Sequence, residues 1–410
     1  MHAAITRNFA SIPGAPRLSG GRTLEIYLVG GAVRDKLLGL PVTERDWVIV
    51  GTTPDAMLKL GYTPVGKDFP VFLHPQTKEE YALARTERKT GPGYTGFETS
   101  AGPGITLQED LLRRDLTINA MAETPAGELV DPYGGKEDLD NGTLRHVSPA
   151  FAEDPVRILR IARFAARFAR QGFHVAHATN TLMRSMVNNG EVAHLVPERV
   201  WAELVKALAT ETPARFFKVL AACGALETLF PEFMPLARDN TADAHGLAAI
   251  ELPVLQQAVT LSDDIAVRFA ALVCDIDRGT TTGFGNDGLT ALCERHRVPN
   301  ACRDLARMAL QQRAQVQAAD SLSAVQLLDL LTTLDAFRRS GRLDQLLLVC
   351  AADARASQHD FSGAQLQQAL AAARSVRADN LVQQGLSGKE IGAALQQQRI
   401  AAIAASLSQS

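Results

Sequence analysis

Two carboxylates stand two positions apart at the start of an apolar run. Glu44 and Asp46 flank Arg45, and a β-type stretch, residues 47–50 (WVIV), follows directly. In a strand, residues i and i+2 point to the same face, so the two carboxylates would lie side by side. Such a pair suits one or two hard divalent cations that bridge the phosphates of a nucleoside triphosphate. The alternative is that two acids near a strand start simply face solvent.

A pair of glycines precedes these acids by about a dozen residues. Gly30 and Gly31 follow the apolar run 27–29, and Arg34 lies in the first turn of the helix-type segment after them. Adjacent glycines let the backbone approach a ligand closely, and a helix N-terminus offers free N–H groups to phosphate. Arg34 could add a bidentate phosphate contact. Taken alone, the motif is more typical of a tight strand–helix turn with a solvated arginine. Its combination with paired carboxylates is much less common by chance.

A third polar cluster occupies residues 113–120 (RRDLTINA). Its apolar positions predict a helix that carries Arg114, Asp115 and Asn119 on a polar side. The competing interpretation is a capped, solvated helix start.

A fourth motif combines a helix start with a stripe of arginines. Asp154 followed by Pro155 predicts a helix N-cap with proline in the first turn. The arginines after it recur every three or four residues, on one helix face: Arg157, Arg160, Arg163, Arg167 and Arg170. A charge stripe is usually a solvated face. Five arginines without an acid among them repel one another, however, unless an anion lies nearby.

The elements that must position these motifs change in kind near residue 150. Before it, short β-type runs at 25–29, 46–50, 71–73 and 80–84 alternate with Gly and Pro turns, whereas helical periodicity dominates after it. The whole chain of 410 residues is too long for one compact core. The pattern predicts an α+β module of about 130 residues followed by a long all-helical arm.

Charge and cysteine usage narrow the class of protein. A net charge of -3 and a pI near 6.3 exclude a strongly basic nucleic-acid coat, but not a nucleic-acid enzyme with a local basic cleft. The five cysteines include no CxxC pair, which favours free thiols in a reducing compartment. No apolar run approaches about 18 residues, so we expect no membrane helix. Residues 1–23 lack a signal-peptide core, and we expect a flexible extension and a cytoplasmic protein. The oligomeric state stays open.

The four motifs together resemble the class II tRNA nucleotidyltransferases, that is, the CCA-adding enzymes and their poly(A) polymerase relatives. The resemblance is strong from residue 25 to about 235 and weaker to the C-terminus. Segments similar to the bacterial CCA-adding branch include LVGGAVRDKLLGLPVTERDW, RRDLTINAMA, DPYGGKEDL and LRHVSPAFAEDPVRILRIARFAARF. The resemblance implies an α+β nucleotidyltransferase head, like that of DNA polymerase β, followed by an elongated all-α neck, body and tail. The implied bounds are extension 1–23, head 24–148, neck 149–235 and body with tail 236–410.

The resemblance also implies roles for residues of the head. Gly30, Gly31 and Arg34 would hold the triphosphate. Glu44 and Asp46 would bind Mg²⁺ and activate the 3′-hydroxyl of tRNA. Glu44 stands where an Asp is common in the family, and its side chain is one methylene longer but still a hard oxygen ligand.

Further roles implied by the resemblance fall on the third motif and on two nearby segments. Arg114 would contact the nucleotide, while Asp115 and Asn119 would order the head–neck junction or the ribose. The polar segment 85–97 (RTERKTGPGYTGF) would assist the switch from C to A addition, its alternative being a simple long hairpin loop. Glu80, near a strand end, is a candidate third carboxylate.

The helix from residue 154 corresponds to the base-reading helix of the family. Asp154 and Arg157 would hydrogen-bond the Watson–Crick edge of the incoming base, and Arg160 and Arg163 would line the same pocket. An arginine fork and a carboxylate present donors and acceptors in a plane, as a pairing base does. Cytosine and adenine both offer an exocyclic amine beside a ring nitrogen acceptor, which uracil and guanine do not.

The sequence departs from the family where many members carry an HD-type metal-dependent phosphohydrolase domain. Cys274, followed by Asp275, stands where the histidine of the His-Asp pair is expected. No histidine occurs between His245 and His296. We therefore expect a degenerate helical domain without phosphohydrolase activity, in which Asp275 is structural or solvated.

The function implied by the resemblance is the addition of C, C and A to the 3′ end of tRNA, with CTP and ATP as substrates and Mg²⁺ as cofactor. The partners would be tRNA, CTP and ATP, with no membrane. A poly(A) polymerase is disfavoured because the chain ends AAIAASLSQS, without an extended basic tail. An enzyme that adds only CC or only A would be a variant of the same activity, and an inactive tRNA-binding module would belong to a different class.

Overall fold

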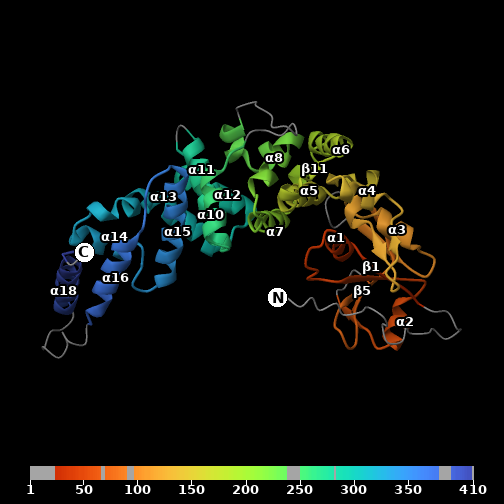
Figure 1. Ribbon diagram of the computed structural model, residues 1–410, viewed down its shortest axis with the longest axis horizontal. Coiled ribbons are helices and arrows are strands. Elements are labelled where there is room, and N and C mark those ends of the chain that lie inside the picture. The colour runs from red at the N-terminus through yellow and green to blue at the C-terminus, as the bar shows by residue number, and fades with distance from the viewer. Residues whose placement is uncertain are drawn as a thin grey trace. The chain divides into compact units, whose positions relative to one another are not determined.

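The structure, a computed structural model, describes residues 24–65, 70–89, 97–237, 250–280, 283–377 and 389–408. The extension predicted at 1–23 lies outside them. Packing divides the chain into two compact units, Met1–Leu195 with Ala222–Ala225, and Val196–Ala221 with Leu226–Ser410 (Figure 1). The boundaries after 148 and 235 fall inside these units and stay predictions.

A seven-stranded mixed sheet forms the core of the first unit. Its order is β3-β4-β5-β2-β1-β8-β9, with β2 and β5 parallel and every other neighbouring pair antiparallel. The strands are β1 (Glu25–Val29), β2 (Asp46–Val50), β3 (Thr63–Val65), β4 (Val71–Leu73), β5 (Glu80–Leu83), β8 (Ala122–Glu123) and β9 (Leu129–Val130). The four strands predicted from the sequence are confirmed, the last ending one residue early.

Both faces of this sheet are covered, which explains why its central strands are apolar almost throughout. One face packs Ile26 and Ile49 against Met57, Tyr62 and Phe72. On the other face Val29 and Val48 belong to a cluster with Leu107 and Leu111. A separate hairpin, β6 (Arg85–Lys89) with β7 (Phe97–Ala101), leaves the sheet directly after β5. Because β2 is paired with β1 on one side and β5 on the other, the sheet positions the start of β2, where the predicted carboxylates of Glu44 and Asp46 lie.

The helices of the first unit are short, apart from two of twelve residues. They are α1 (Gly31–Leu37), α2 (Pro54–Lys59), α3 (Leu107–Leu112), α4 (Gly135–Asp140), α5 (Val156–Arg167) and α6 (His177–Asn188). A capping box of Thr106 and Glu109 starts α3. Short 3₁₀ turns join them: η1 (Thr117–Asn119), η2 (Pro149–Glu153), η3 (Ala169–Gln171) and η4 (Glu191–His194).

The helix predicted over 113–120 is wrong. α3 ends at Leu112, and only η1 follows. Leu116 is extended, with φ −123°, forms a bridge with His146, and donates its N–H to the Asp115 carboxylate at 2.8 Å. The local side-chain hydrogen bond and the strand-like pairing replace the helical bonds of this segment.

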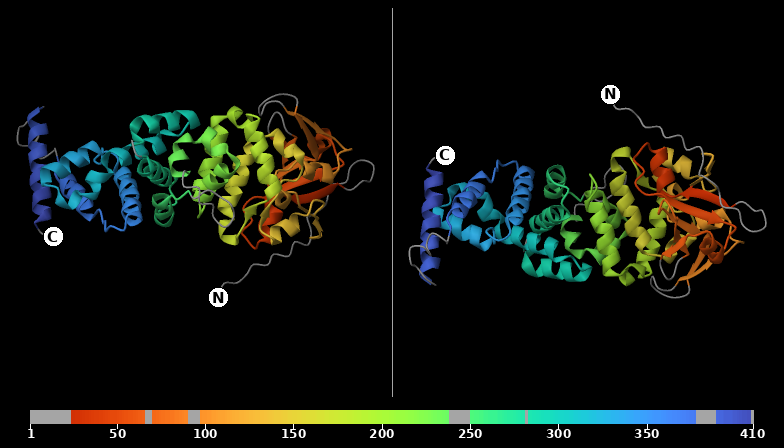
Figure 2. Two further views of the ribbon diagram at one scale, coloured as in Figure 1. Left: turned by 90° about the horizontal axis from the view of Figure 1, so that it is seen from above. Right: turned by 90° about the horizontal axis from the view of Figure 1, so that it is seen from below.

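Helix α5 belongs to the yellow part of the first unit (Figure 2). Its apolar residues, including Ile158, Ile161 and Phe164, are buried, while its arginines are half-buried or exposed. It begins at Val156, whose N–H donates to Asp154 Oδ1 at 3.1 Å. A two-stranded parallel ladder, β10 (Thr143–Leu144) with β11 (His174–Val175), adjoins it. β11 lies in the neck, where the sequence predicts helix alone.

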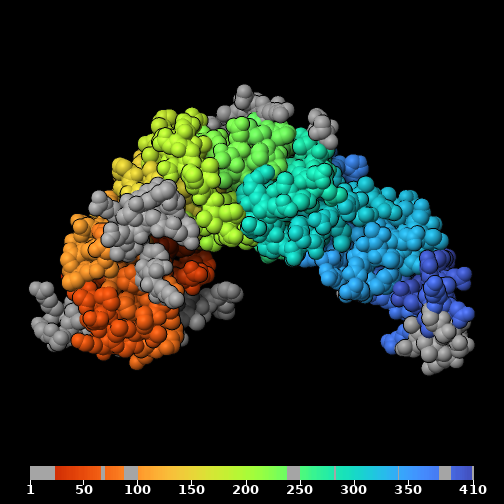
Figure 3. All heavy atoms as spheres, turned by 180° about the vertical axis from the view of Figure 1, so that it is seen from behind, coloured from red at the N-terminus to blue at the C-terminus, as the bar shows by residue number. Residues whose placement is uncertain are grey.

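The second unit is helical throughout its described residues. The helices from 197 onward are α7 (Pro197–Leu208), α8 (Ala214–Cys223), α9 (Ala225–Leu229), η5 (Pro231–Ala237), α10 (Pro253–Leu261), α11 (Ile265–Gly279), α12 (Gly285–His296), α13 (Asn300–Gln317), η6 (Ala319–Ser321), α14 (Ala324–Thr333), α15 (Ser340–Ala356), α16 (Ala364–Ser375) and α18 (Lys389–Leu407). Helix α11 is buried from Ala266 to Ile276, between α10, α13 and α15. Figure 3 shows the surface of this unit from behind, coloured from green to blue along the chain.

The predicted fold class, an α+β head followed by a helical chain, is confirmed. None of the described helices is long and apolar enough to cross a membrane.

Candidate active site

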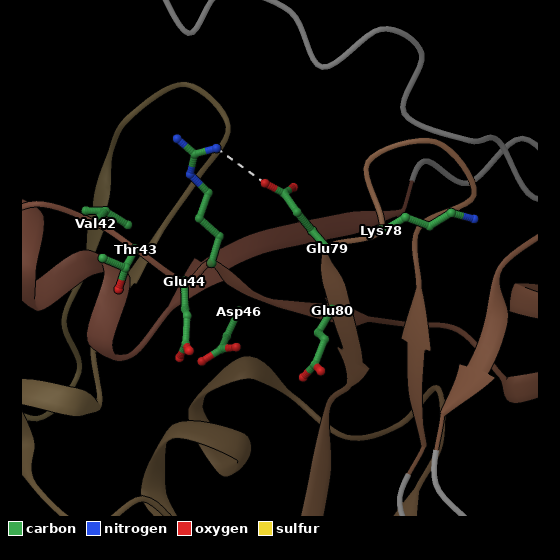
Figure 4. Close-up of a pocket in the computed structure, with 8 residues that line it drawn as sticks. Val42, Thr43, Glu44, Asp46, Lys78, Glu79 and Glu80 are labelled. Atoms are coloured by element: carbon green, nitrogen blue, oxygen red, sulfur yellow. Dashed lines mark hydrogen bonds and ion pairs between the residues drawn. The ribbon is translucent and has the colours of Figure 1, made fainter. Parts of the chain in front are cut away.

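Three carboxylates gather where β2 and β5 begin. Asp46 is the first residue of β2, and the parallel register sets it opposite Glu80, the first residue of β5. Figure 4 shows the carboxylates of Glu44, Asp46 and Glu80 on one side of these strands, and Glu79 pointing to the other. A cavity of about 480 Å³ opens here, lined by Val42, Thr43, Glu44, Arg45, Asp46, Lys78, Glu79 and Glu80. Glu79 and Glu80 point to opposite sides because successive side chains of a strand alternate between its two faces.

The charge state of Asp46 depends on its surroundings. Partial burial of its carboxyl group raises its pKa, the Arg114 guanidinium lowers it, and the neighbouring Glu44 raises it again, with a net increase. A carboxylate that repels a like neighbour is stabilised by a bound cation. The pair therefore favours a cation over two bare negative charges.

The donor set fits a hard divalent ion. Within the described residues, no three His, Cys, Asp or Glu side chains are arranged to hold an ion by themselves. Mg²⁺ is commonly bound through one or two carboxylates, with substrate phosphates and waters completing the octahedron. Glu44 and Asp46, with Glu80 beside them, could supply the protein part of such a shell.

The glycine turn brings Arg114 close to these acids. Gly30 adopts φ +69° and donates its N–H to the Met121 carbonyl at 3.1 Å. A Cβ atom at Gly30 would stand 2.7 Å from Arg114 Nη1. The guanidinium of Arg114 therefore lies directly against the turn, and its charge also acts on Asp46. The structure thus joins Gly30, Arg114 and Asp46 in one place.

Arg34 lies inside the protein rather than on an open surface. Only 3% of the residue is exposed. Its guanidinium donates to Asp35 Oδ1 from Nε at 2.8 Å and from Nη2 at 2.7 Å, and to Asn119 Oδ1. It also lies over the rings of Phe164 and Phe168, at 5.0 and 5.1 Å from their centroids. In this arrangement Arg34 supports the turn from behind, whereas the sequence predicts a phosphate contact.

Asp115 and Asn119 connect the turn to helix α5. Asn119 accepts a hydrogen bond from Arg34 and donates Nδ2–H to Asp115 Oδ1 at 2.9 Å. Arg160 of α5 donates Nε–H to Asp115 Oδ2 at 2.7 Å. Burial opposes ionisation of Asp115, but Arg160 and Asn119 hold its pKa well below the ordinary value. These contacts form a continuous network from α1 to α5.

Two residues of the predicted base-reading set lie at the start of α5. Arg157 donates to the carbonyls of Arg113 and Ala150 at 2.6 and 3.1 Å. Asp154 is half-buried and caps the helix. Further along α5, the Arg163 guanidinium lies 4.1 Å from the centre of the Phe164 ring. None of these three residues lines the cavity at the carboxylates.

Asp110 is a buried acid that contacts Arg113 and Arg114 and that the sequence motifs do not include. It is fully buried and accepts hydrogen bonds from both Arg113 and Arg114. Although burial opposes ionisation, the two guanidinium groups lower the pKa of Asp110. The signal is present in the sequence, because an acid three and four residues before two arginines on a helix predicts ion pairing.

The Cys274 region of the second unit is tightly packed. Cys274 is fully buried, and burial raises the pKa of its thiol to about 12. Asp275 accepts the N–H groups of Val254 and Leu255 at 3.0 and 2.8 Å, at the start of α10. His296 contacts the Leu229 carbonyl at 2.8 Å, and His245 lies outside the described residues. Asp275 therefore caps a helix.

Comparison with known families first places the chain in a class. Residues 26–145 match the poly A polymerase head domain, and residues 172–236 match a domain described as the probable RNA and SrmB-binding site of polymerase A. This class of nucleotidyltransferases uses divalent metal ions.

Relatives identify the branch within the class. The multifunctional CCA protein of Nitrosococcus oceani is 54% identical over 93% of this chain and 98% of that protein. The protein of that name from Thioalkalivibrio sulfidiphilus is 52% identical over 93% and 98%. The chain belongs to the family of the multifunctional CCA proteins.

Solved structures show the same fold at lower identity. The Bacillus stearothermophilus CCA-adding enzyme in complex with CTP is 22% identical over 93% of this chain and 89% of that chain, with a TM-score of 0.66. A tRNA nucleotidyltransferase complexed with a primer tRNA and an incoming ATP analog is 23% identical over 82% and 93%, with a TM-score of 0.57.

Proposed function

We propose that this chain is a CCA-adding enzyme, which adds C, C and A to the 3′ end of tRNA from CTP and ATP, with Mg²⁺, and releases pyrophosphate. The observation that carries the proposal is the set of carboxylates at Glu44, Asp46 and Glu80 beside Gly30 and Arg114. The names of the relatives and the ligands of the solved neighbours support it.

In the proposed reaction, the tRNA 3′-hydroxyl gives its proton to a carboxylate of the Glu44 and Asp46 pair, and its oxygen bonds to the α-phosphorus of the incoming nucleotide. The bond from that phosphorus to the leaving pyrophosphate breaks at the same time. Glu44 and Asp46 would hold Mg²⁺, which supplies charge neutralisation at the phosphates when bound. The Gly30 turn brings backbone N–H groups and Arg114 to the triphosphate. Since these groups are fixed before the nucleotide arrives, little reorganisation accompanies the reaction.

Base selection is proposed to reside at the start of α5. Asp154 and Arg157 would pair with the amine and ring nitrogen that cytosine and adenine share. Arg157 already donates to two backbone carbonyls, so its guanidinium is held near the α5 start rather than free to swing. Arg160 is anchored on Asp115 and would shape the pocket from behind.

We propose further that the chain lacks metal-dependent phosphohydrolase activity. The support is local: the Cys274 thiol is buried, and both oxygens of Asp275 accept backbone N–H groups. The test is an assay of 2′,3′-cyclic nucleotide hydrolysis with Ni²⁺, Mn²⁺ and Co²⁺ in turn. Hydrolysis that disappears in Asp275→Ala would refute this proposal.

The five cysteines are free and buried, which fits a reducing compartment, and we place the activity in the cytoplasm. The domain bounds proposed for the chain are head 24–148, neck 149–235, and body with tail 236–410.

The decisive experiment supplies tRNA lacking CCA with each nucleoside triphosphate and sequences the 3′ ends. We expect CC with CTP alone and CCA with CTP plus ATP. A run of A residues would indicate a poly(A) polymerase, and addition of CC alone would indicate a partial enzyme. Absence of any product, with tRNA still bound, would indicate a binding module. A suitable control is Asp140→Ala, since Asp140 is an exposed acid on α4.

A further inference from the structure

We propose that Asp110 is a positioning residue for nucleotide binding, because its buried carboxylate fixes Arg114 against the Gly30 turn and ties both to the base of the β6–β7 hairpin. The inference rests on the proposed function for the identity of the nucleotide. None of the four sequence motifs includes Asp110.

The two carboxylate oxygens of Asp110 accept hydrogen bonds from different partners. Oδ1 accepts from Arg113 Nε at 3.1 Å, from Arg113 Nη2 at 2.9 Å and from the Arg85 backbone N–H at 3.3 Å. Oδ2 accepts from Arg114 Nη2 at 3.2 Å. Asp110 has no exposed surface, so water cannot substitute for these partners.

The negative charge of Asp110 also stabilises the adjacent arginines Arg113 and Arg114 at this place. The side chains of Arg113 and Arg114 are each only 18% exposed, and their like charges oppose one another. A carboxylate in contact with both compensates this repulsion. Within the described residues, Asp110 is the acid with which Arg114 forms an ion pair.

The other end of Arg114 reaches the active site. Its Nη1 lies against Gly30 and approaches the Asn119 carbonyl at 3.5 Å. The Nε atom is buried and has no hydrogen-bond partner among the described residues. The contact between Nη2 and Asp110 is therefore the main directional restraint on this guanidinium, and its loss would let Arg114 leave the turn.

The same carboxylate reaches two further elements. Through the Arg85 N–H it holds the first residue of β6, directly after β5 and the active-site strands. Asp110 also holds Arg113 through its side chain, and the backbone carbonyl of Arg113 accepts a hydrogen bond from Arg157 Nη2 at 2.6 Å. A single buried group thus joins the hairpin base, the triphosphate turn and the start of α5.

The test uses Asp110→Asn in the full-length chain. Asparagine keeps the shape and one acceptor oxygen, but it removes the charge that both arginines contact. We expect KM for CTP and ATP to rise about tenfold, the effect of losing one charge-assisted hydrogen bond, with kcat within about threefold of wild type. Hydrogen exchange at Arg85 and its hairpin neighbours should become faster.

Asp138→Asn is the matched control. Asp138 is another buried acid of the same unit, 6% exposed, that accepts from Arg145 Nε at 3.0 Å and from Thr117 Oγ1 at 2.7 Å. A purely structural loss should affect both variants alike in melting temperature. Only Asp110→Asn is expected to raise the nucleotide KM.

Two outcomes would overturn the inference. One is a folded Asp110→Asn protein whose KM values stay within about twofold of wild type. The other is unchanged hydrogen exchange at the hairpin base, a readout that needs no substrate and stands even if wild-type protein does not extend tRNA. Should Asp110→Asn fail to fold, Arg114→Lys replaces it. One ammonium group cannot contact Asp110 and the turn together, so an unchanged KM in Arg114→Lys would also refute the inference.

Discussion

The contact between Gly30 and Arg114 makes a quantitative prediction for Gly30→Ala. The added Cβ would lie 2.7 Å from Arg114 Nη1, while ordinary contacts begin at 3.4 Å, so the guanidinium must retreat by about 0.7 Å or more. Arg114 is a flexible side chain and can move. The protein should therefore fold, with Arg114 displaced from the site.

The Gly30→Ala substitution has two separate effects, one on stability and one on activity. Alanine at φ +69° and ψ −127°, a backbone conformation that favours glycine, is strained by about 1–3 kcal/mol, which lowers stability. The displacement of Arg114 adds little to that loss, but it disturbs a group that we propose contacts the triphosphate. A misplacement of about 1 Å at a catalytic site can reduce the rate about 100-fold. We expect kcat/KM for CTP and ATP to fall by roughly 10- to 100-fold.

Gly39→Ala provides the matched control. Gly39 also has a positive φ, +68°, but a Cβ there would meet no atom within 4 Å. Both variants place alanine at a positive φ, so both should lose melting temperature in a thermal unfolding assay. Steady-state kinetics of C and A addition should distinguish them, with Gly39→Ala close to wild type. Equal losses of kcat/KM in both variants, or wild-type kinetics in Gly30→Ala, would refute the reasoning.

Three further predictions concern the carboxylates and the base-reading helix. Asp46→Ala should abolish incorporation of both C and A while tRNA binding in a gel-shift assay stays nearly intact, and normal activity would remove the metal-site assignment. Arg157→Ala should reduce the preference for C and A over U and G by about 1–3 kcal/mol, measured by competition between nucleotides, and an unchanged preference would contradict the template role. Burial raises the pKa of Asp275 to about 7. The folded chain then binds a proton that the unfolded chain has released, so stability should fall as pH rises from about 4 to 7, by up to about 4 kcal/mol. Unfolding curves of Asp275→Asn should lack this part of the pH dependence, and an identical dependence would rule it out.

Local patterns in the sequence are sufficient for the strands and for the carboxylate pair. The alternation rule predicts that Glu44 and Asp46 share a face, and Figure 4 shows them so. The rule involves only neighbours along the chain. It cannot predict that Glu80 lies opposite Asp46, because the parallel register of β2 and β5 depends on the intervening β3 and β4.

The placement of Arg34 depends on contacts distant in sequence. Its amide partner, Asn119, is 85 residues away, and the rings that cover it belong to α5 and the residue that follows it. An arginine after a glycine turn predicts a phosphate contact when the turn is considered alone. In the folded chain a buried carboxylate, an amide and two aromatic faces compete for the same guanidinium and hold it.

The arginine stripe shows what a charge pattern can and cannot indicate. Arginines that have no acid beside them in the sequence repel one another unless an anion lies nearby. From the sequence pattern alone, a bound ligand is the expected anion. The structure supplies two from the protein itself: Asp115 accepts from Arg160 across 45 residues, and Asp35 from Arg167 across 132. Because both acids belong to segments beside the glycine turn, the stripe joins α5 to the proposed triphosphate site. A one-sided charge pattern therefore indicates that partners exist, while only the tertiary fold determines whether they are ligands or the protein's own carboxylates.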